Sequence, residues 1–345
     1  MRLLIVANLG NTKSNSNGQT IKSIELVDFL SSSGFEIITE NTSRWSISNI
    51  FFKFPLLFVK YLKAEKVIIL PADRAVKFLL PFFNFAIFLK RKSVYYIVIG
   101  AWLSEFIKNN KRYLLYVRKL EKIYAETNIL VENLSKMGLS NVKLLVNFKN
   151  LSRSLSDQSM KFNRYKAIPF KVCTLSRITE RKGLLDLMNV INRINSEFGK
   201  TVYHLDIFGP IEKDFYNRFT SEMNNNISYR GELSQNVIIE TLSEYFLLVF
   251  PTKIRTEGHP GTIIDAYSSG LPVISSRWDA ANQFVSRHTG FIYEMNDLDG
   301  LYTILINTYQ QPEIIENMRK NCYQESMKYD TQKILSELIL DIRKS

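Results

Sequence analysis

Short apolar runs alternate with longer amphipathic segments along the chain. In the first half, the runs rich in branched and aromatic residues are typical of buried strands. Segments between them, such as residues 20–30 and 112–125, have the apolar spacing of helices. Alternating strands and helices over this length predict a doubly wound parallel sheet. The predicted strands are residues 3–7, 35–39, 66–70, 94–99, 129–131 and 142–146.

The alternation stops in a polar stretch, residues 150–166, and begins again at residues 171–175. We therefore predict an α/β fold of two Rossmann-like domains, residues 1–160 and 161–328, facing a central cleft. Residues 329–345 read as a C-terminal helix that can pack back on the N-terminal domain. The further strands of the second half are residues 203–208, 227–229, 247–250 and 272–275, and its helices are residues 182–198, 213–224, 235–245, 261–269 and 312–328.

Composition narrows the choice of partners and compartment. The 345 residues are 46% hydrophobic and carry a net charge of +12, so the chain attracts anions such as nucleic acid, phosphorylated small molecules or acidic lipids. Only two cysteines occur, which fits a reducing cytoplasm. The N-terminus lacks the pattern of a signal peptide, and the most apolar stretch, residues 78–89, is shorter than the roughly 20 residues that span a bilayer.

The most informative segment runs from Phe250 to Ile274 and reads strand, loop, helix, strand. Pro260 suits a first helical position, so the amides of the next three residues, Gly261, Thr262 and Ile263, should be free to bind a phosphate or a hydroxyl. Two carboxylates, Glu257 and Asp265, bracket this anion site. Carboxylates accept hydrogen bonds from hydroxyl groups, so they indicate a ligand that carries a sugar. The alternative is that Glu257 only favours the helix dipole and Asp265 is a solvated surface charge.

A second segment, Leu175-Ser-Arg-Ile-Thr-Glu-Arg-Lys-Gly-Leu-Leu-Asp186, leads from a strand through a basic loop into a helix. Its cations, Arg177, Arg181 and Lys182, could neutralise a diphosphate. The alternative is a solvated basic turn. Because both segments follow strands of the same predicted sheet, we expect them to lie at the same edge.

These motifs in this order resemble the retaining family-4 glycosyltransferases of GT-B fold. The resemblance rests on Arg177 with Lys182-Gly183, on Gly209 after a strand, on Tyr229-Arg-Gly231, and on Glu257 followed by Asp265 and Gly270-Leu-Pro-Val-Ile. It covers roughly residues 171–294 with specific motifs and the N-terminal half in outline. It implies a donor-binding C-terminal domain and an acceptor-binding N-terminal domain.

The resemblance also implies residue roles. Arg177 and Lys182 would hold the donor diphosphate, and Glu257 would contact the donor sugar together with the loop formed by Gly258, His259, Pro260, Gly261 and Thr262. Asp265 stands where the family more often has a second glutamate and would accept hydrogen bonds from the ribose. Gly209 and Gly231 would lie near the nucleobase. Gly18, in Asn17-Gly-Gln-Thr20, would stand in the family's glycine-rich loop near the donor phosphates.

The family often has a histidine after its fourth strand, but this chain reads Val98-Ile-Gly-Ala-Trp102 there and has no histidine before His204. The expected reaction is transfer of a sugar from a nucleotide-diphosphate sugar, with retention and without a dedicated base, a metal or any cofactor besides that co-substrate. Asp297-Leu-Asp299 reads as a helix N-terminal cap rather than as a metal site.

The expected acceptor is a glycan or an undecaprenyl-diphosphate-linked glycan of bacterial surface-polysaccharide synthesis, such as capsule or O-antigen. Two stretches that mix aromatic residues with lysine, residues 51–63 and 77–92, could bind an anionic membrane surface at the inner face of the cell membrane, or could be core helices with charged ends. A nucleotide-sugar epimerase or a phosphorylase of the same fold is an alternative, and so is a non-catalytic basic membrane- or nucleic-acid-binding protein. No recognised nucleic-acid motif supports a nucleic-acid partner.

Overall fold

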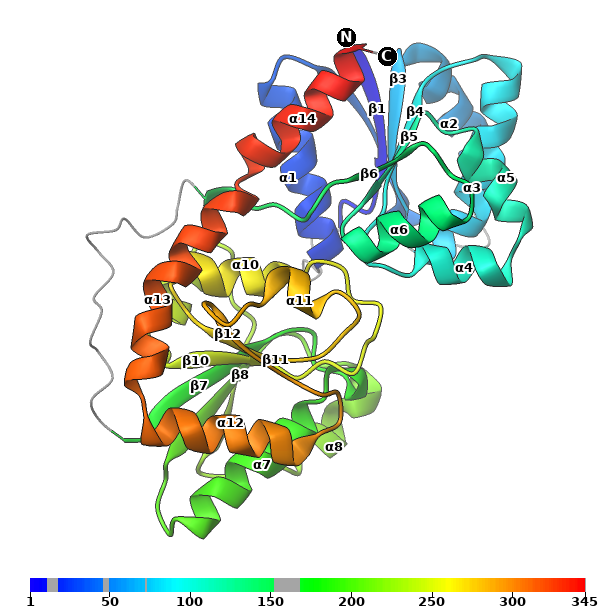
Figure 1. Ribbon diagram of the computed structural model, residues 1–345. Helices are drawn as coiled ribbons and strands as arrows, with labels where there is room; N and C mark the ends of the chain where they lie inside the picture. The colour runs from blue at the N-terminus through cyan, green and yellow to red at the C-terminus, as the bar shows by residue number, and fades with distance from the viewer. Residues whose placement is uncertain (11–17, 46–49, 72, 152–167, 345) are drawn as a thin grey trace. The chain divides into compact units, whose positions relative to one another are not determined.

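The computed structural model describes residues 1–345 except 11–17, 46–49, 72, 152–167 and 345. The chain divides into two units, each built around a parallel sheet (Figure 1). Unit 1 comprises Met1–Asn150, Thr256–His259 and Asp330–Ser345, and unit 2 comprises Leu151–Arg255 and Pro260–Tyr329. The predicted boundary between residues 160 and 161 lies outside the described residues.

The sheet of unit 1 has six parallel strands in the order β2-β1-β3-β4-β5-β6. Strand side chains alternate between faces, and both faces are buried: Leu4 and Val6 belong to one apolar cluster, Leu3 and Ile5 to another. This explains why the strands read as continuous apolar runs. The strands are β1 (Arg2–Ala7), β2 (Glu36–Asn41), β3 (Lys66–Leu70), β4 (Val94–Ile97), β5 (Lys122–Ala125) and β6 (Val142–Leu144).

Helices cover both faces of this sheet. One cluster takes side chains from α2 (Ile50–Lys63), α3 (Asp73–Leu89), α4 (Leu103–Asn109), α5 (Arg112–Arg118) and α6 (Asn128–Lys136). The other takes side chains from α1 (Gly18–Ser32) and α14 (Thr331–Lys344). None of the helices that the structure describes is long and apolar enough to cross a membrane.

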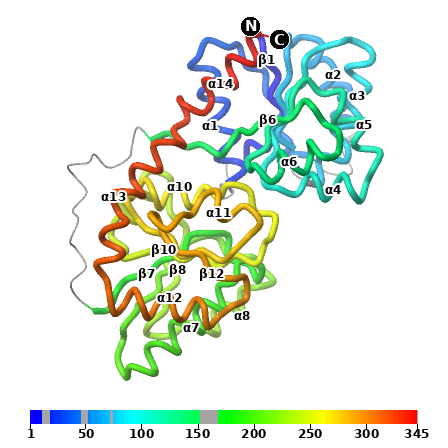
Figure 2. The backbone as a smooth tube through the Cα atoms, viewed as in Figure 1, coloured from blue at the N-terminus to red at the C-terminus, as the bar shows by residue number. Residues whose placement is uncertain are grey.

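The C-terminal helix α14 belongs to unit 1. Its Asp341 accepts hydrogen bonds from the Tyr124 hydroxyl at 2.9 Å and from Lys143 Nζ at 3.1 Å, and it lies 3.3 Å from Lys122 Nζ. Figure 2 follows the backbone to this helix, whose end lies near the start of β1 in unit 1. Polar contacts to β5 and β6 therefore supplement the apolar packing of α14.

Unit 2 repeats the architecture with six parallel strands in the order β12-β11-β10-β7-β8-β9. The strands are β7 (Phe170–Leu175), β8 (Tyr203–Phe208), β9 (Ile227–Gly231), β10 (Leu247–Phe250), β11 (Val273–Ser276) and β12 (Gly290–Tyr293). The helices are α7 (Leu184–Glu197), α8 (Tyr216–Thr220), α9 (Ile238–Ser243), α10 (Gly261–Ser268), α11 (Ala281–Phe284), α12 (Leu298–Gln310) and α13 (Glu313–Ser326).

The prediction of two Rossmann-like α/β halves is confirmed, but the helix predicted over residues 112–125 and the strand predicted at residues 129–131 are both wrong. The predicted helix over residues 112–125 ends at Arg118, and Lys122–Ala125 is strand β5. The predicted strand at residues 129–131 lies inside α6, which begins where the side chain of Thr127 accepts a hydrogen bond from Leu130 N at 3.2 Å. A run of three branched apolar residues fits a buried helix as well as a strand, so only the cap distinguishes them.

Candidate functional site

The basic turn of unit 2 is held against the end of β10. Gly183 has φ +68°, and a Cβ there would lie 2.0 Å from the Pro251 carbonyl oxygen, so only glycine fits. Lys253 N donates to the Arg181 carbonyl at 2.8 Å, and the Lys182 ammonium lies 5.2 Å from the centre of the Phe250 ring. The two segments predicted to share one edge of the sheet therefore lie in contact.

The start of α10 lies at the end of β7. The Thr262 hydroxyl donates a 2.7 Å hydrogen bond to the carbonyl of Leu175, two residues before Arg177. Pro260 is the N-cap rather than the first helical residue, and Ile263 N donates to Pro260 O at 3.0 Å. The prediction of three free amides is therefore wrong for Ile263, whose donor is used within the turn. Helix geometry leaves the amides of Gly261 and Thr262 directed out of the helix start.

Gly209 and Gly231 extend the same edge along the sheet. Gly209 has φ +125°, and a Cβ there would lie 1.9 Å from the Ser176 carbonyl oxygen. Gly209 N donates to Gly231 O at 2.8 Å, and the Tyr229 hydroxyl donates to Gly209 O at 3.0 Å. Glycine at position 209 thus lets the loop after β8 approach the residue that precedes Arg177.

Asp265 lies in the second turn of α10 and is only 6% exposed. The interpretation of Asp265 as a solvated surface charge is therefore wrong. Its backbone carbonyl accepts hydrogen bonds from the amide and hydroxyl of Ser269. A buried carboxylate needs hydrogen bonds or a charged partner, which agrees with a structural or ligand-binding role.

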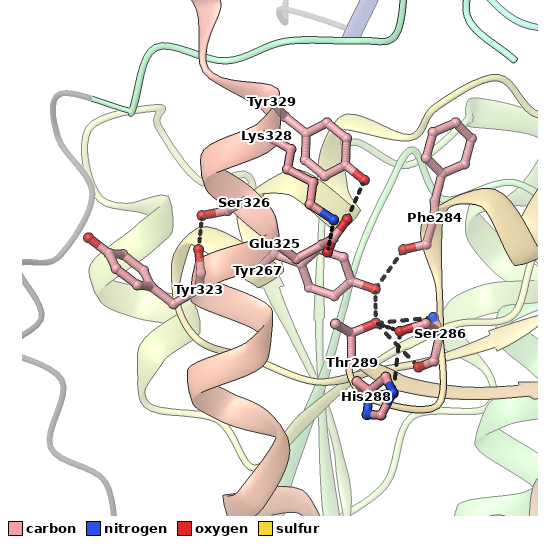
Figure 3. A network of polar contacts seen from close by, with 10 residues as sticks. All are labelled: Tyr267, Phe284, Ser286, His288, Thr289, Tyr323, Glu325, Ser326, Lys328 and Tyr329. Carbon is pink, nitrogen blue, oxygen red and sulfur yellow. Dashed lines mark hydrogen bonds and ion pairs between the residues drawn. The ribbon is translucent and has the colours of Figure 1, made fainter. Parts of the chain in front are cut away.

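The middle of α10 is fixed by the buried hydroxyl of Tyr267. Figure 3 shows this hydroxyl between the Phe284 carbonyl, at 2.8 Å, and the Thr289 hydroxyl, at 2.9 Å. From α13, Glu325 accepts hydrogen bonds from Lys328 at 2.8 Å and from Tyr329 at 3.1 Å. Burial raises the pKa of Tyr267 well above its usual value, so the phenol stays protonated. Helix α10, at whose N-terminus the sequence predicts an anion site, is therefore anchored at a buried position.

Positive charge and backbone hydrogen-bond donors lie together at the carboxyl ends of β7 and β10 in unit 2, which we call the described edge. Arg177 and Arg181 are exposed, whereas Lys182 is half-buried. Cations and outward amides at the carboxyl end of a parallel sheet can bind a phosphate or diphosphate. The exposure of Arg177 and Arg181 also fits the alternative of a solvated basic turn, so the diphosphate role of these cations stays a prediction.

The remaining predicted residues lie in unit 1. Glu257 is half-buried, in the segment Thr256–His259. His259 is 3% exposed, and burial together with the charge of Lys22 holds the pKa of its imidazole well below the usual range. Unit 1 therefore contains a histidine, but a neutral and buried one. Because its imidazole is buried, His259 does not present an exposed side chain to a donor.

Gly18 is the first residue of α1, not part of a loop, and a Cβ there would meet no atom within 4 Å. Space within the described residues therefore does not require glycine at this position. The neighbouring Asn17 lies outside the described residues. The role of Gly18 near donor phosphates stays a prediction.

Sequence reasoning missed two charged residues of unit 1. Lys22 on α1 and Glu126, directly after β5, are buried and form an ion pair at 2.6 Å. The sequence signal for Glu126 is its position immediately after a buried strand. The prediction of a helix over residues 112–125 hides that signal, because it places a helix where β5 lies. The prediction for the acidic pair near residue 298 is confirmed instead: the Asp297 side chain caps α12 by accepting from Gly300 N at 2.9 Å.

Residues 169–311 match the family described as glycosyl transferases group 1. A GDP-mannose-dependent monoacylated alpha-(1-6)-phosphatidylinositol monomannoside mannosyltransferase of Corynebacterium glutamicum is 25% identical over 142 residues, which are 40% of this chain and 37% of that relative.

Two solved structures resemble the whole chain at low sequence identity. Anabaena Alr3699/HepE in complex with UDP and glucose has a TM-score of 0.79 and 13% identity, with 100% of both chains covered. Sucrose-phosphate synthase from Thermosynechococcus elongatus has a TM-score of 0.78 and 13% identity, with 99% of this chain and 98% of that chain covered. The chain therefore has the GT-B fold, and its residues 169–311 match the group 1 glycosyl transferases.

Proposed function

We propose that this protein is a retaining glycosyltransferase that moves a sugar from a nucleotide-diphosphate sugar to a hydroxyl of a glycan or lipid-linked acceptor. The transfer needs no metal ion and no cofactor besides the donor. One observation carries the proposal: the hydrogen bond from Thr262 to Leu175 fixes the start of α10 beside the loop that bears Arg177. Lys182 belongs to the same edge through the contact of Gly183 with Pro251.

The comparisons support the class of donor. The matched family covers the part of the chain that contains this edge, and the mannosyltransferase of Corynebacterium glutamicum is named for its use of GDP-mannose. Alr3699/HepE was solved with UDP and glucose. These names agree with a nucleoside diphosphate bound at the described edge of unit 2.

Charge stabilisation is the main chemical task. When the bond between the sugar C1 and the phosphate oxygen breaks, negative charge grows on the leaving diphosphate. Arg177 and Lys182 supply positive charge, and the amides of Gly261 and Thr262 supply hydrogen bonds. Glu257 accepts hydrogen bonds from the donor sugar, and Asp265 accepts them from the ribose.

Retention removes the need for a protein base. The acceptor hydroxyl attacks C1 from the face that the diphosphate leaves, and the departing phosphate oxygen takes the hydroxyl proton. A new bond forms between C1 and the acceptor oxygen as the C1–phosphate bond breaks. A neutral, buried His259 is consistent with this scheme, because no imidazole has to exchange protons with the acceptor.

The first test is a binding screen followed by a transfer assay. A ligand that binds only the folded protein raises its melting temperature, so we expect one nucleoside diphosphate and its sugar to stabilise the chain most. With that donor, free nucleoside diphosphate should appear only after acceptor is added, and the product should keep the anomeric configuration by NMR. Stabilisation by no nucleotide would contradict the proposal. Donor conversion without acceptor would instead indicate an epimerase.

Helices α2 and α3 of unit 1, the predicted acceptor-binding half, carry an apolar and basic surface. The two helices pack together through the stacked rings of Phe54 and Phe82, whose centres are 5.1 Å apart. Phe52 and Phe88 are each 82% exposed. Residues 52–63 contain three lysines and no acid, and α3 is followed by Lys90-Arg-Lys92. Exposed aromatic rings flanked by cations favour binding to anionic lipid headgroups, and such binding would bring the protein to a lipid-linked acceptor at the inner face of the membrane.

Sedimentation with vesicles of phosphatidylglycerol and phosphatidylcholine tests this surface. Binding should be strong at low salt and weaker at high salt, because ions screen the lysines. Phe52→Ser with Phe88→Ser should reduce binding. Leu340→Ser is the matched control, because Leu340 is 54% exposed on α14. Equal binding by both variants would contradict this part of the proposal.

A further inference from the structure

A buried ion pair lies in the interior of unit 1. Lys22 Nζ on α1 lies 2.6 Å from Glu126 Oε1, and the two side chains are 2% and 3% exposed. The Lys22 ammonium also lies 5.4 Å from the centre of the Phe148 ring. Burying two charges costs several kcal/mol per ion, and an apolar pair of similar volume is often as stable. Stability alone therefore does not explain this pair.

The second oxygen of the carboxylate faces backbone amides. Glu126 Oε2 accepts a hydrogen bond from Gly100 N at 2.8 Å and a longer one from His259 N at 3.4 Å. Lys22 holds one oxygen, so the other is directed at these two amides. The carboxylate thus connects α1, the loop after β4 and the segment Thr256–His259.

The same segment is held at two further points. Ala101 N donates to Thr256 O at 3.1 Å, and Asn147 Nδ2 donates to His259 O at 3.1 Å. The backbone on either side of Glu257 and Gly258 is therefore hydrogen-bonded to unit 1. Fixing the flanking peptide groups restricts the direction of the Glu257 side chain.

Gly258 gives independent evidence of close packing on the carboxylate. A Cβ at Gly258 would lie 2.0 Å from Glu126 Oε2 and 2.8 Å from Gly100 Cα. Gly258 is not in the left-handed region, so space rather than backbone conformation requires glycine there. The backbone next to Glu257 therefore rests directly on Glu126.

We propose that Glu126 is a positioning residue: its carboxylate, oriented by Lys22, fixes the backbone of Thr256–His259 and thereby the direction of Glu257. The proposal rests on the proposed function, in which Glu257 contacts the donor sugar. It assigns Glu126 no contact with substrate. The charge of Lys22 serves to hold and compensate the carboxylate in the interior.

Two double variants separate positioning from simple ion pairing. Lys22→Met with Glu126→Gln removes both charges but keeps an oxygen that can accept from Gly100 N and His259 N. Lys22→Met with Glu126→Met removes both charges and that acceptor. Both leave an uncharged interior of similar volume, so neither contains an unpaired buried charge. The comparison between them isolates the acceptor.

We call the variant with Lys22→Met and Glu126→Met Met/Met, and the variant with Lys22→Met and Glu126→Gln Met/Gln. The kcat of Met/Met should be at least about tenfold below that of Met/Gln, because small misplacements of a substrate-contacting group lower the rate strongly. The dissociation constant for the preferred nucleoside diphosphate should be the same in both. Hydrogen–deuterium exchange should be faster in Met/Met at the amides of Gly100 and His259. Equal exchange in the two variants would overturn the proposal, and so would faster exchange with equal kcat.

A second variant covers the case in which Met/Met fails to fold. Gly258→Ala leaves Lys22 and Glu126 in place but pushes the segment away from the carboxylate, so it should lower kcat and raise exchange at His259 in the same way. Unchanged kcat and exchange in Gly258→Ala would overturn the proposal. If the wild-type chain transfers no sugar, the proposed function fails, and the exchange rates alone decide whether Glu126 holds the segment.

Discussion

The hydroxyl of Thr262 donates a 2.7 Å hydrogen bond to the backbone carbonyl of Leu175. This contact joins the first turn of α10 to the last residue of β7, and Arg177 follows two residues later. The position of the helix start relative to the basic loop is therefore set by a side chain as well as by sheet topology.

Replacing Thr262 with Val removes this hydrogen bond while keeping the branched shape of the side chain. A typical hydrogen bond contributes about 0.5–1.5 kcal/mol, so we expect the affinity for the preferred nucleoside diphosphate to fall by about two- to thirteenfold. Isothermal titration calorimetry measures the change. Thr262→Ser keeps the hydroxyl and is the control. If Val and Ser variants bound equally well, the contact would not support the site.

Arg177→Ala and Lys182→Ala should each lower kcat/KM by the equivalent of about 1.5–3 kcal/mol, the scale of a charged hydrogen bond. The loss should be in turnover, because charge on the diphosphate grows as the bond breaks. Steady-state kinetics with the preferred donor measures it. Lys200→Ala is the control, since Lys200 is exposed and lies 5.7 Å from the Tyr309 ring centre. Near-normal turnover in both variants would remove the diphosphate assignment.

Glu257→Gln should lower kcat while leaving the binding of the plain nucleoside diphosphate nearly intact. The amide keeps the size of the side chain but loses a charged acceptor for sugar hydroxyls. Calorimetry with the diphosphate and with the intact nucleotide sugar separates the two effects. Equal loss of affinity for both ligands would argue against contact with the sugar.

The fold was predictable because buried parallel strands produce continuous apolar runs. Leu3, Leu4, Ile5 and Val6 are all fully buried, and such runs recur in both halves of the sequence. Between Arg112 and Lys136 this signal failed, since apolar residues there suit a helix and a strand equally. A single capping residue, Thr127, decides where α6 begins.

The candidate site was predictable to the extent that it is local in sequence. Arg177 and Lys182 stand in one loop, and Pro260 to Asp265 form one helix start. The pair of Lys22 and Glu126 was missed because its members are 104 positions apart and only the fold brings them together. The burial of Asp265 was also unpredictable, because it depends on the packing of the whole helix.

Tyr267→Phe should lower the free energy of unfolding by about 1–3 kcal/mol, because the buried carbonyl of Phe284 loses its donor. Urea unfolding followed by circular dichroism measures the loss. Tyr323→Phe is the control: Tyr323 lies on α13, and its ring points away from the polar network (Figure 3). Loss of the hydroxyl from this half-buried ring should change the free energy of unfolding by no more than about 0.5 kcal/mol. Equal effects of the two variants would mean that the Tyr267 hydroxyl contributes no more than that of Tyr323.

The burial of His259 makes stability depend on pH. Burial and the charge of Lys22 hold the pKa of His259 well below the usual 6.5, so the folded protein keeps it neutral where the unfolded chain takes up a proton. Unfolding then binds a proton, and the free energy of unfolding falls as the pH is lowered below about 6.5, by at most about 1.4 kcal/mol per pH unit for one group. His259→Gln should lose this part of the slope between pH 7.5 and pH 5.5, whereas the exposed His288→Gln should keep it. Urea unfolding across that range measures both variants, and a slope unchanged in His259→Gln would show that this imidazole titrates normally in the folded protein.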